Sequence, residues 1–382
     1  MRHDETYRPL RVGDGRISGY LSVALGVLSL GAVLCFLFPD WLTTPSLRVS
    51  YDLVLLRRLL TAGMVFSAGF GLITFVLNRQ KRLGAIGISL TLLALYLGGS
   101  GVQVGPRYDA PGYLGLDWFI LDLLGSALLY IMLEKIFPQA REQPVLRPDF
   151  WHDGRYFIFN HLAISIFVFV SLRVTPALFD TPLFSWSINA GVQAWFRDLP
   201  WIVQFLGIMV TADLVEYATH RAMHEIPVLW RFHAVHHSVE HMDWLAGSRL
   251  HILEPLATRF LVMLPAFILG AQDTPLLAYI VFAGFQAGLV HANVGLTFGP
   301  LKYLFNTPLF HHWHHASDAE AIDTNYAAHL PVIDRIFGTY HMPTDRWPVK
   351  YGVVGQPLPK GLVRQFLYPF RHKAPVVNGR EE

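Results

Sequence analysis

Apolar residues are gathered in long segments along most of this chain. A helix needs about 20 mostly apolar residues to cross the hydrocarbon core of a membrane. Six segments approach or reach that length, at roughly residues 17–38, 59–77, 83–104, 115–137, 156–178 and 198–219. Two shorter stretches, at about 256–270 and 275–291, are interrupted by proline and glycine, and we interpret them as a hairpin that spans or re-enters the membrane. The pattern predicts an all-α integral membrane protein with about six to eight transmembrane helices.

The composition supports a membrane protein and narrows the chemistry. Of the 382 residues 53% are apolar and only 15% are charged, whereas about a quarter of a soluble domain is charged. The net charge is +2, and no stripe of Lys and Arg with interleaved aromatics indicates a nucleic-acid partner. Cys35 is the only cysteine, which excludes four-thiolate iron–sulfur clusters and Cys-ligated zinc ribbons. Any metal must therefore be bound by nitrogen or oxygen.

Basic residues between the spans indicate the orientation. They precede the first span, separate the second from the third and follow the fourth: Arg2, Arg8, Arg11, Arg16, Arg79, Lys81, Arg82, Lys135, Arg141, Arg147 and Arg155. By the positive-inside rule these segments are cytoplasmic, although Arg48, Arg57 and Arg58 in the first outer loop oppose this assignment. Carried forward, the orientation places the chain after the sixth span, from His220 onward, in the cytoplasm.

A polar segment that contains proline divides the chain near residue 145. We expect three parts: an N-terminal four-helix membrane region (1–145), a more polar histidine-rich domain (146–360) and a C-terminal tail (361–382).

Twelve of the 18 histidines fall between residues 220 and 315, and their spacing is more informative than their number. Separations of three and four place imidazoles on one face of a helix. A first cluster shows one such pair, two later clusters repeat the pattern HxxHH, and one histidine stands alone between them. The resulting nine candidates are His220, His224, His233, His236, His237, His291, His311, His314 and His315.

The nine candidates lie on four segments that the topology places at one face of the membrane. One pair of histidines on a helix is common by chance, but a solvated basic face would be built from Lys and Arg rather than from repeated histidines. Nine neutral nitrogen donors suit two divalent transition-metal ions, since imidazole binds iron, zinc, copper and nickel alike. We predict a cytoplasmic, histidine-rich helical cap that holds a dimetal centre.

Four other residues near these clusters are candidates to support the ligands. Asp213 and Glu216 precede His220 by two turns and one turn of the helix, and a carboxylate there would fix an imidazole tautomer. The alternative is that both carboxylates simply lie at the membrane interface. His251 could orient a ligand or a substrate, and His312 lies about 100° around the helix from its neighbour, outside the ligand set.

We interpret six of the remaining histidines as surface or structural residues: His3, His152, His161, His329, His341 and His372. His241, which lies just beyond the second cluster, stays open.

The order of these motifs resembles that of the fatty acid hydroxylase / sterol desaturase superfamily over roughly residues 200–345. The matching segments are Asp213-x-x-Glu216-Tyr217-x-x-His220-Arg221-x-x-His224, His233-x-x-His236-His237-Ser238, His291-Ala292-Asn293, His311-x-x-His314-His315, Asn325-Tyr326 and Asp334-Arg335-Ile336-Phe337-Gly338-Thr339.

The resemblance implies a non-haem di-iron centre that uses O2 to hydroxylate or desaturate a membrane lipid. The nine histidines would be its ligands, and Asn293 would join the supporting residues. No His-Pro-Gly-Gly sequence marks a fused cytochrome domain, so a separate electron donor is expected, either a ferredoxin or a b-type cytochrome with its reductase. In a bacterium the membrane would be the plasma membrane.

Two other functions fit part of the pattern. A zinc-dependent membrane hydrolase could use the same imidazoles, but the chain lacks an HExxH motif. A metal transporter would need histidines or carboxylates at mid-membrane depth, where only His161 is expected. Lipid oxidation is the function that we carry forward, with hydroxylation slightly favoured over desaturation.

Overall fold

The computed structural model describes residues 16–48, 50–78, 81–105, 113–163, 190–344, 346–355 and 358–371. Within these ranges the chain forms helices and two isolated β-bridges, and no strand. Six helices are long and apolar enough to cross a membrane: Ile17–Leu37, Leu53–Leu77, Arg82–Gly101, Leu116–Ile136, Trp201–Glu225 and Asp273–His291. The predicted all-α membrane fold is confirmed. Of the expected span at 156–178, residues up to 163 are helical and the rest lies outside the described residues.

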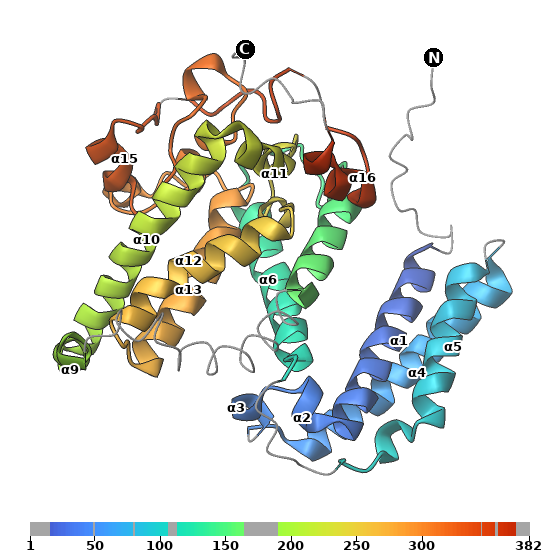
Figure 1. Ribbon diagram of the computed structural model, residues 1–382. Coiled ribbons are helices and arrows are strands. Elements are labelled where there is room, and N and C mark those ends of the chain that lie inside the picture. Colours follow the sequence, from blue (N-terminus) through green and yellow to red (C-terminus); the bar gives the residue numbers. More distant parts are fainter. Residues whose placement is uncertain are drawn as a thin grey trace, which may run out of the picture. The chain divides into compact units, whose positions relative to one another are not determined.

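The chain divides into two compact units, residues 1–123 with 168–173 and residues 124–167 with 174–382. In the first unit α1 (Arg16–Leu37), α4 (Leu53–Leu77) and α5 (Arg82–Tyr96) pack side by side (Figure 1). The short helices α2 (Pro39–Leu42) and α3 (Pro45–Arg48) lie between α1 and α4 in the sequence.

Small residues allow the three long helices of the first unit to approach closely. A Cβ atom added to Gly87 of α5 would lie 1.9 Å from Ser22 Oγ of α1. Ser22 and Ser67 each donate a hydroxyl hydrogen bond to the other's backbone carbonyl, at 2.8 and 2.7 Å. Each buried hydroxyl group is therefore satisfied by a backbone carbonyl of the neighbouring helix.

The helix α4 begins six residues before the predicted span at 59–77. Asp52 caps it by accepting hydrogen bonds from the backbone amides of Val54 and Leu55, at 2.9 and 3.1 Å. Arg57, expected in the first outer loop, therefore lies within α4, and its side chain donates to the backbone carbonyls of Ser100 and Val102.

The second unit is built around α10 (Trp201–Glu225), α12 (Leu253–Ile268) and α13 (Asp273–His291), which lie side by side in Figure 1. Their shared core consists of Phe196, Ile208, Met209, Ala212, Val262, Ala266 and Tyr279. A short turn at Gly270, with φ of +64°, joins α12 to α13, as the predicted hairpin requires. The helix α13 is among those long and apolar enough to cross a membrane, and α12, with 16 residues, is not.

Four shorter helices complete the second unit. They are α11 (Pro227–His237), α14 (Pro308–His314), α15 (Pro331–Phe337) and α16 (Leu362–Leu367). The first three begin with a proline in the first turn, where its missing N–H costs no helical hydrogen bond. Two further helices are α6 (Leu116–Ile136), which crosses the border between the two units, and α9 (Ala190–Arg197), which precedes α10.

Candidate metal centre

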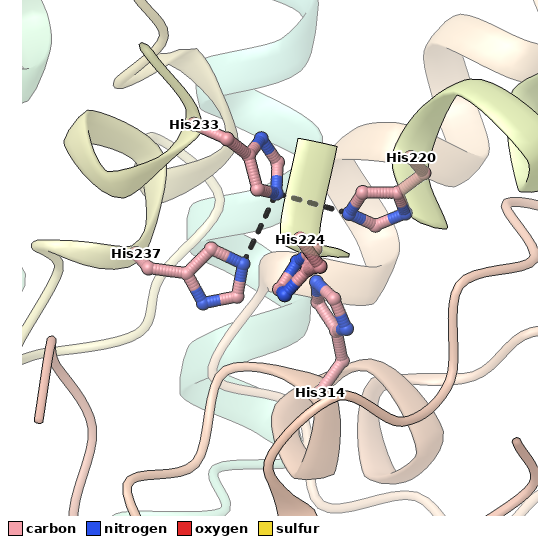
Figure 2. Close-up of side chains that lie close together, drawn as sticks. All are labelled: His220, His224, His233, His237 and His314. Atoms are coloured by element: carbon pink, nitrogen blue, oxygen red, sulfur yellow. Dashed lines mark hydrogen bonds between the residues drawn. The ribbon is translucent and has the colours of Figure 1, made fainter. Parts of the chain in front are cut away.

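The nine histidines that the sequence singles out come together in two groups, all within the second unit. The group that we name site A contains His220, His224, His233, His237 and His314. The group that we name site B contains His236, His291, His311 and His315. Within each group the candidate ligand nitrogens all lie within 4.8 Å of one another. Figure 2 shows how the five imidazoles of site A converge from α10, α11 and α14.

Two of the helices contribute to both sites, in a reciprocal way. On α11 the two histidines four residues apart belong to site A, and the one between them, His236, belongs to site B. On α14 and its C-cap the pair four residues apart belongs to site B, and His314 belongs to site A. His237 of site A stacks on His315 of site B with ring centroids 4.5 Å apart, so the two sites are adjacent.

Backbone carbonyls fix the outer nitrogen of four of these imidazoles. The Nδ1 contacts are His220 to Tyr326 at 2.8 Å, His236 to Arg249 at 3.2 Å, His291 to Ala287 at 2.7 Å and His314 to Thr324 at 2.8 Å. A carbonyl oxygen only accepts hydrogen bonds, so Nδ1 carries the proton in each case. The Nε2 atom of each neutral ring then presents a lone pair.

A carboxylate plays the same part for a fifth imidazole. The Nδ1 atom of His233 lies 2.8 Å from Glu254 Oε1, and both side chains are buried. Glu254 lies in the first turn of α12 and was not identified from the sequence. The sequence offered only that Glu254 follows His251 by three residues, and His251 was not part of a repeated histidine pattern.

The inward nitrogens have the spacing of metal ligands. The Nε2 atoms of His220 and His233 are 3.1 Å apart, and those of His236 and His291 are 3.2 Å apart. Since each of these four rings carries its proton on Nδ1, the short contacts join lone pairs and are not hydrogen bonds. Metal–imidazole bonds of ~2.0–2.1 Å would separate neighbouring ligand nitrogens by roughly 3.0 Å at octahedral angles and 3.4 Å at tetrahedral angles. The donor set and its spacing therefore fit metal ions.

Burial keeps the imidazoles in the form that binds metal. Desolvation, reinforced by neighbouring imidazoles, lowers the pKa of His236, His237, His311 and His315 well below the ordinary value. Burial also lowers the pKa of His314 to about 3. Neutral rings at neutral pH are the state required of a nitrogen ligand.

The carboxylates expected on α10 lie near the centre, but Asp213 supports the backbone. Its carboxylate accepts hydrogen bonds from the backbone amides of Ala328, His329 and Leu330, at 2.7, 3.1 and 2.7 Å. It thereby ties α10 to the segment that follows Tyr326. Glu216 lies close enough to Asp213, Glu254 and Arg259 to interact with their charges.

The other three residues that we expected to support the ligands contact other parts of the second unit. His251 stacks on Phe366, and its Nε2 lies 3.0 Å from the backbone carbonyl of that residue. Asn293 exchanges two hydrogen bonds with the backbone of Ala140. His312 lies between Tyr351 Oη at 3.0 Å and the backbone carbonyl of Ala292 at 3.2 Å, next to the end of α13.

Three of the histidines that we expected to be surface or structural residues have hydrogen-bond partners outside the two sites. His152 contacts Gln365, His161 contacts the backbone carbonyl of Phe157, and His329 lies between Gln286 and Tyr279. His241 and His341 belong to neither site. His3 and His372 lie outside the described residues.

Comparison with known proteins finds similarity to enzymes that oxidise lipids. Residues 205–339 match the model of the fatty acid hydroxylase family. The chain is 28% identical over 310 residues to an ornithine lipid hydroxylase of Rhizobium tropici, covering 80% of this chain and 89% of that protein. It is 28% identical over 204 residues to the alkylglycerol monooxygenase of Danio rerio and 31% identical over 159 residues to that of Homo sapiens. These matches cover 50% and 42% of this chain, but only 44% and 34% of the two animal proteins. No solved structure matches the chain at a significant level.

A helical membrane domain with two adjacent groups of neutral imidazoles defines a histidine-box metalloprotein. Residues 205–339 are thus similar to the fatty acid hydroxylase family, and the matched relatives indicate an oxidoreductase that acts on lipids.

Proposed function

We propose that this protein uses two iron ions and O2 to oxidise a C–H bond of a membrane lipid, with the nine imidazoles of sites A and B as the metal ligands. The observation that carries the proposal is the reciprocal arrangement of the two HxxHH segments, which gives two adjacent sites with nitrogen donors only. Two ferrous ions in such sites would supply electrons and open coordination positions for the reduction of O2.

The surrounding residues shape the site for this chemistry. Trp230 and Tyr326 pack against His224 with ring centroids 5.1 Å away in each case. Trp230 also packs against His237 of the same site, with ring centroids 5.4 Å apart. These aromatic residues keep water away from the imidazoles, so that the oxidising centre reacts with substrate rather than with solvent.

The stoichiometry of the reaction requires an external reductant. Conversion of C–H to C–OH consumes O2, two electrons and two protons and releases one water molecule. Desaturation has the same electron demand and releases two water molecules. We propose that a separate ferredoxin, or a b-type cytochrome with its reductase, supplies the electrons.

A polar membrane lipid is the first substrate to test. The Rhizobium tropici relative, which is matched along most of its length, is a hydroxylase of ornithine lipid, and the animal relatives are monooxygenases of alkylglycerols. These names favour a new hydroxyl group over a new double bond. The positive-inside pattern supports a location of sites A and B on the cytoplasmic side, at the plasma membrane if the cell is bacterial.

Lipid analysis of a deletion strain tests the proposal. Mass spectrometry of its lipids, compared with those of the parent strain, should reveal loss of one oxygenated species and accumulation of its precursor. Reintroduced wild-type protein should restore the product, whereas His236→Ala and His314→Ala should not. His241→Ala provides a matched control, because this histidine belongs to neither site. Full product formation by either of the first two variants would refute the assignment.

Metal analysis separates this function from its rivals. Two irons per chain after anaerobic reconstitution support the oxygenase. Ester cleavage by a zinc-loaded protein would support a hydrolase, and metal flux into vesicles would support a transporter.

A further inference from the structure

A buried polar network lies beside site B, and its N-terminal members precede the part of the chain that matches the family model. Arg147 Nη2 contacts Asp153 Oδ2 at 2.6 Å and Asp243 Oδ1 at 2.5 Å, and Arg249 Nε contacts Asp153 Oδ1 at 2.5 Å. All four side chains are at most 4% exposed. Two arginines and two aspartates balance in charge, so the network needs no metal ion to neutralise it.

This network positions the segment that holds His236. The backbone carbonyl of Arg249 accepts the Nδ1–H of His236. On either side of it, Asn160 Nδ2 donates to the carbonyls of Ser248 and Leu250, both at 3.0 Å. The Arg249 guanidinium also donates to the carbonyl of Ser238, which caps the C-terminal end of α11.

The same loop contacts a second ligand of site B. Gly247 lies so close to His291 that an added Cβ atom would be 2.8 Å from its Nδ1. Glu134 of α6 accepts backbone hydrogen bonds from Trp244 at 2.8 Å and from Asn293 at 3.1 Å. It thus joins the start of this loop to the end of α13, where His291 lies.

Site A is supported differently. The outer nitrogens of His220, His233 and His314 contact Tyr326, Glu254 and Thr324, which all lie within residues 205–339. None of these three partners belongs to the buried network beside site B.

We infer that Glu134, Arg147, Asp153 and Asn160 form a brace that positions the imidazoles of site B and sets metal occupancy there, while site A is independent of it. Part of the fourth span and the helical segment at 150–163 thus belong functionally to the metal centre. The inference rests on the proposed two-metal centre, but it concerns metal binding and not lipid oxidation.

Metal content measured after anaerobic reconstitution with ferrous iron tests the brace. Asp153→Asn and Asn160→Leu should each lower the content from about two ions per chain to about one. Combined with His236→Ala, which already disables site B, Asp153→Asn should cause no further loss. Combined with His224→Ala, which disables site A, it should leave almost no metal. This pattern of non-additivity identifies the affected site.

A buried carboxylate in the first unit supplies the control. Asp40 pairs with Arg48, and Asp40→Asn should retain both metals. The inference is overturned if Asp153→Asn and Asn160→Leu both keep two metals, or if Asp153→Asn removes metal from the His236→Ala background. If Asp153→Asn fails to fold, Gly247→Ala provides a further variant, because its methyl group would press directly on His291. It should also lose metal only at site B. Only one metal in the wild-type protein would instead refute the proposed dimetal function.

Discussion

The contact between Glu254 and His233 gives a quantitative prediction for site A. The carboxylate accepts the Nδ1–H of His233 at 2.8 Å, and this hydrogen bond increases the electron density available at Nε2. In Glu254→Gln the amide oxygen can still accept the bond, but the negative charge is lost. Loss of a supporting contact of this kind lowers metal affinity by about 10- to 100-fold. Because the hydrogen bond is kept, we expect about a tenfold loss at site A, or about 1.4 kcal/mol.

Competition with a chelator of known affinity measures this change. The titration is best done in the His236→Ala background, where site A is the remaining site, so that a single affinity is fitted. Glu216→Gln is the matched control, because it makes the same chemical change one turn before His220, and it should bind metal as the parent does. Unchanged affinity in Glu254→Gln would refute the idea that this carboxylate tunes His233. An equal loss in Glu216→Gln would show that general electrostatics, rather than the hydrogen bond, causes the effect.

Three further predictions concern folding. Asp213→Ala leaves three backbone amides without their acceptor, which costs about 1–3 kcal/mol for each amide that stays buried. The unfolding temperature in detergent should therefore fall strongly, and unchanged stability would contradict the role assigned to this carboxylate. Burial lowers the pKa of His314 to about 3, and the unfolded chain titrates near 6.5. Between these values the unfolded state binds more protons, so metal-free protein should become less stable as pH falls through this range. Gly87→Ala places a methyl group 1.9 Å from Ser22 Oγ and should disrupt the first unit, whereas Gly69→Ala meets open space and should not; thermal unfolding compares the two variants, and equal stability would contradict the close packing.

The fold and the clustering of the nine histidines were largely predictable from the sequence. Apolar segments near the length of a bilayer leave few alternatives to membrane helices, because lipid cannot satisfy an open backbone. The nine histidines were identified because separations of three and four align side chains on a helix whatever its surroundings. The boundaries expected near residues 145 and 360 stay predictions.

The assignment of each histidine to a site depended on the tertiary structure. Spacing alone suggests that the three histidines of an HxxHH segment act together, yet His236 and His314 each belong to the site opposite to that of their own pair. The angle between i and i+3 turns the middle imidazole toward a different neighbour. Only the tertiary structure brings His236 to His291 and His237 to His314.

The supporting contacts were likewise beyond the reach of the sequence. Carboxylates close in sequence to the histidines seemed the best candidates, but Asp213 serves three backbone amides, and His233 is supported by Glu254, 21 residues away. Four imidazoles are held by backbone carbonyls, which every residue possesses and no motif reveals. The sequence by itself therefore determined which donors are present and that they lie on helical segments of a membrane protein. The tertiary structure decided which donors meet and which partners orient them, because both depend on contacts between distant segments.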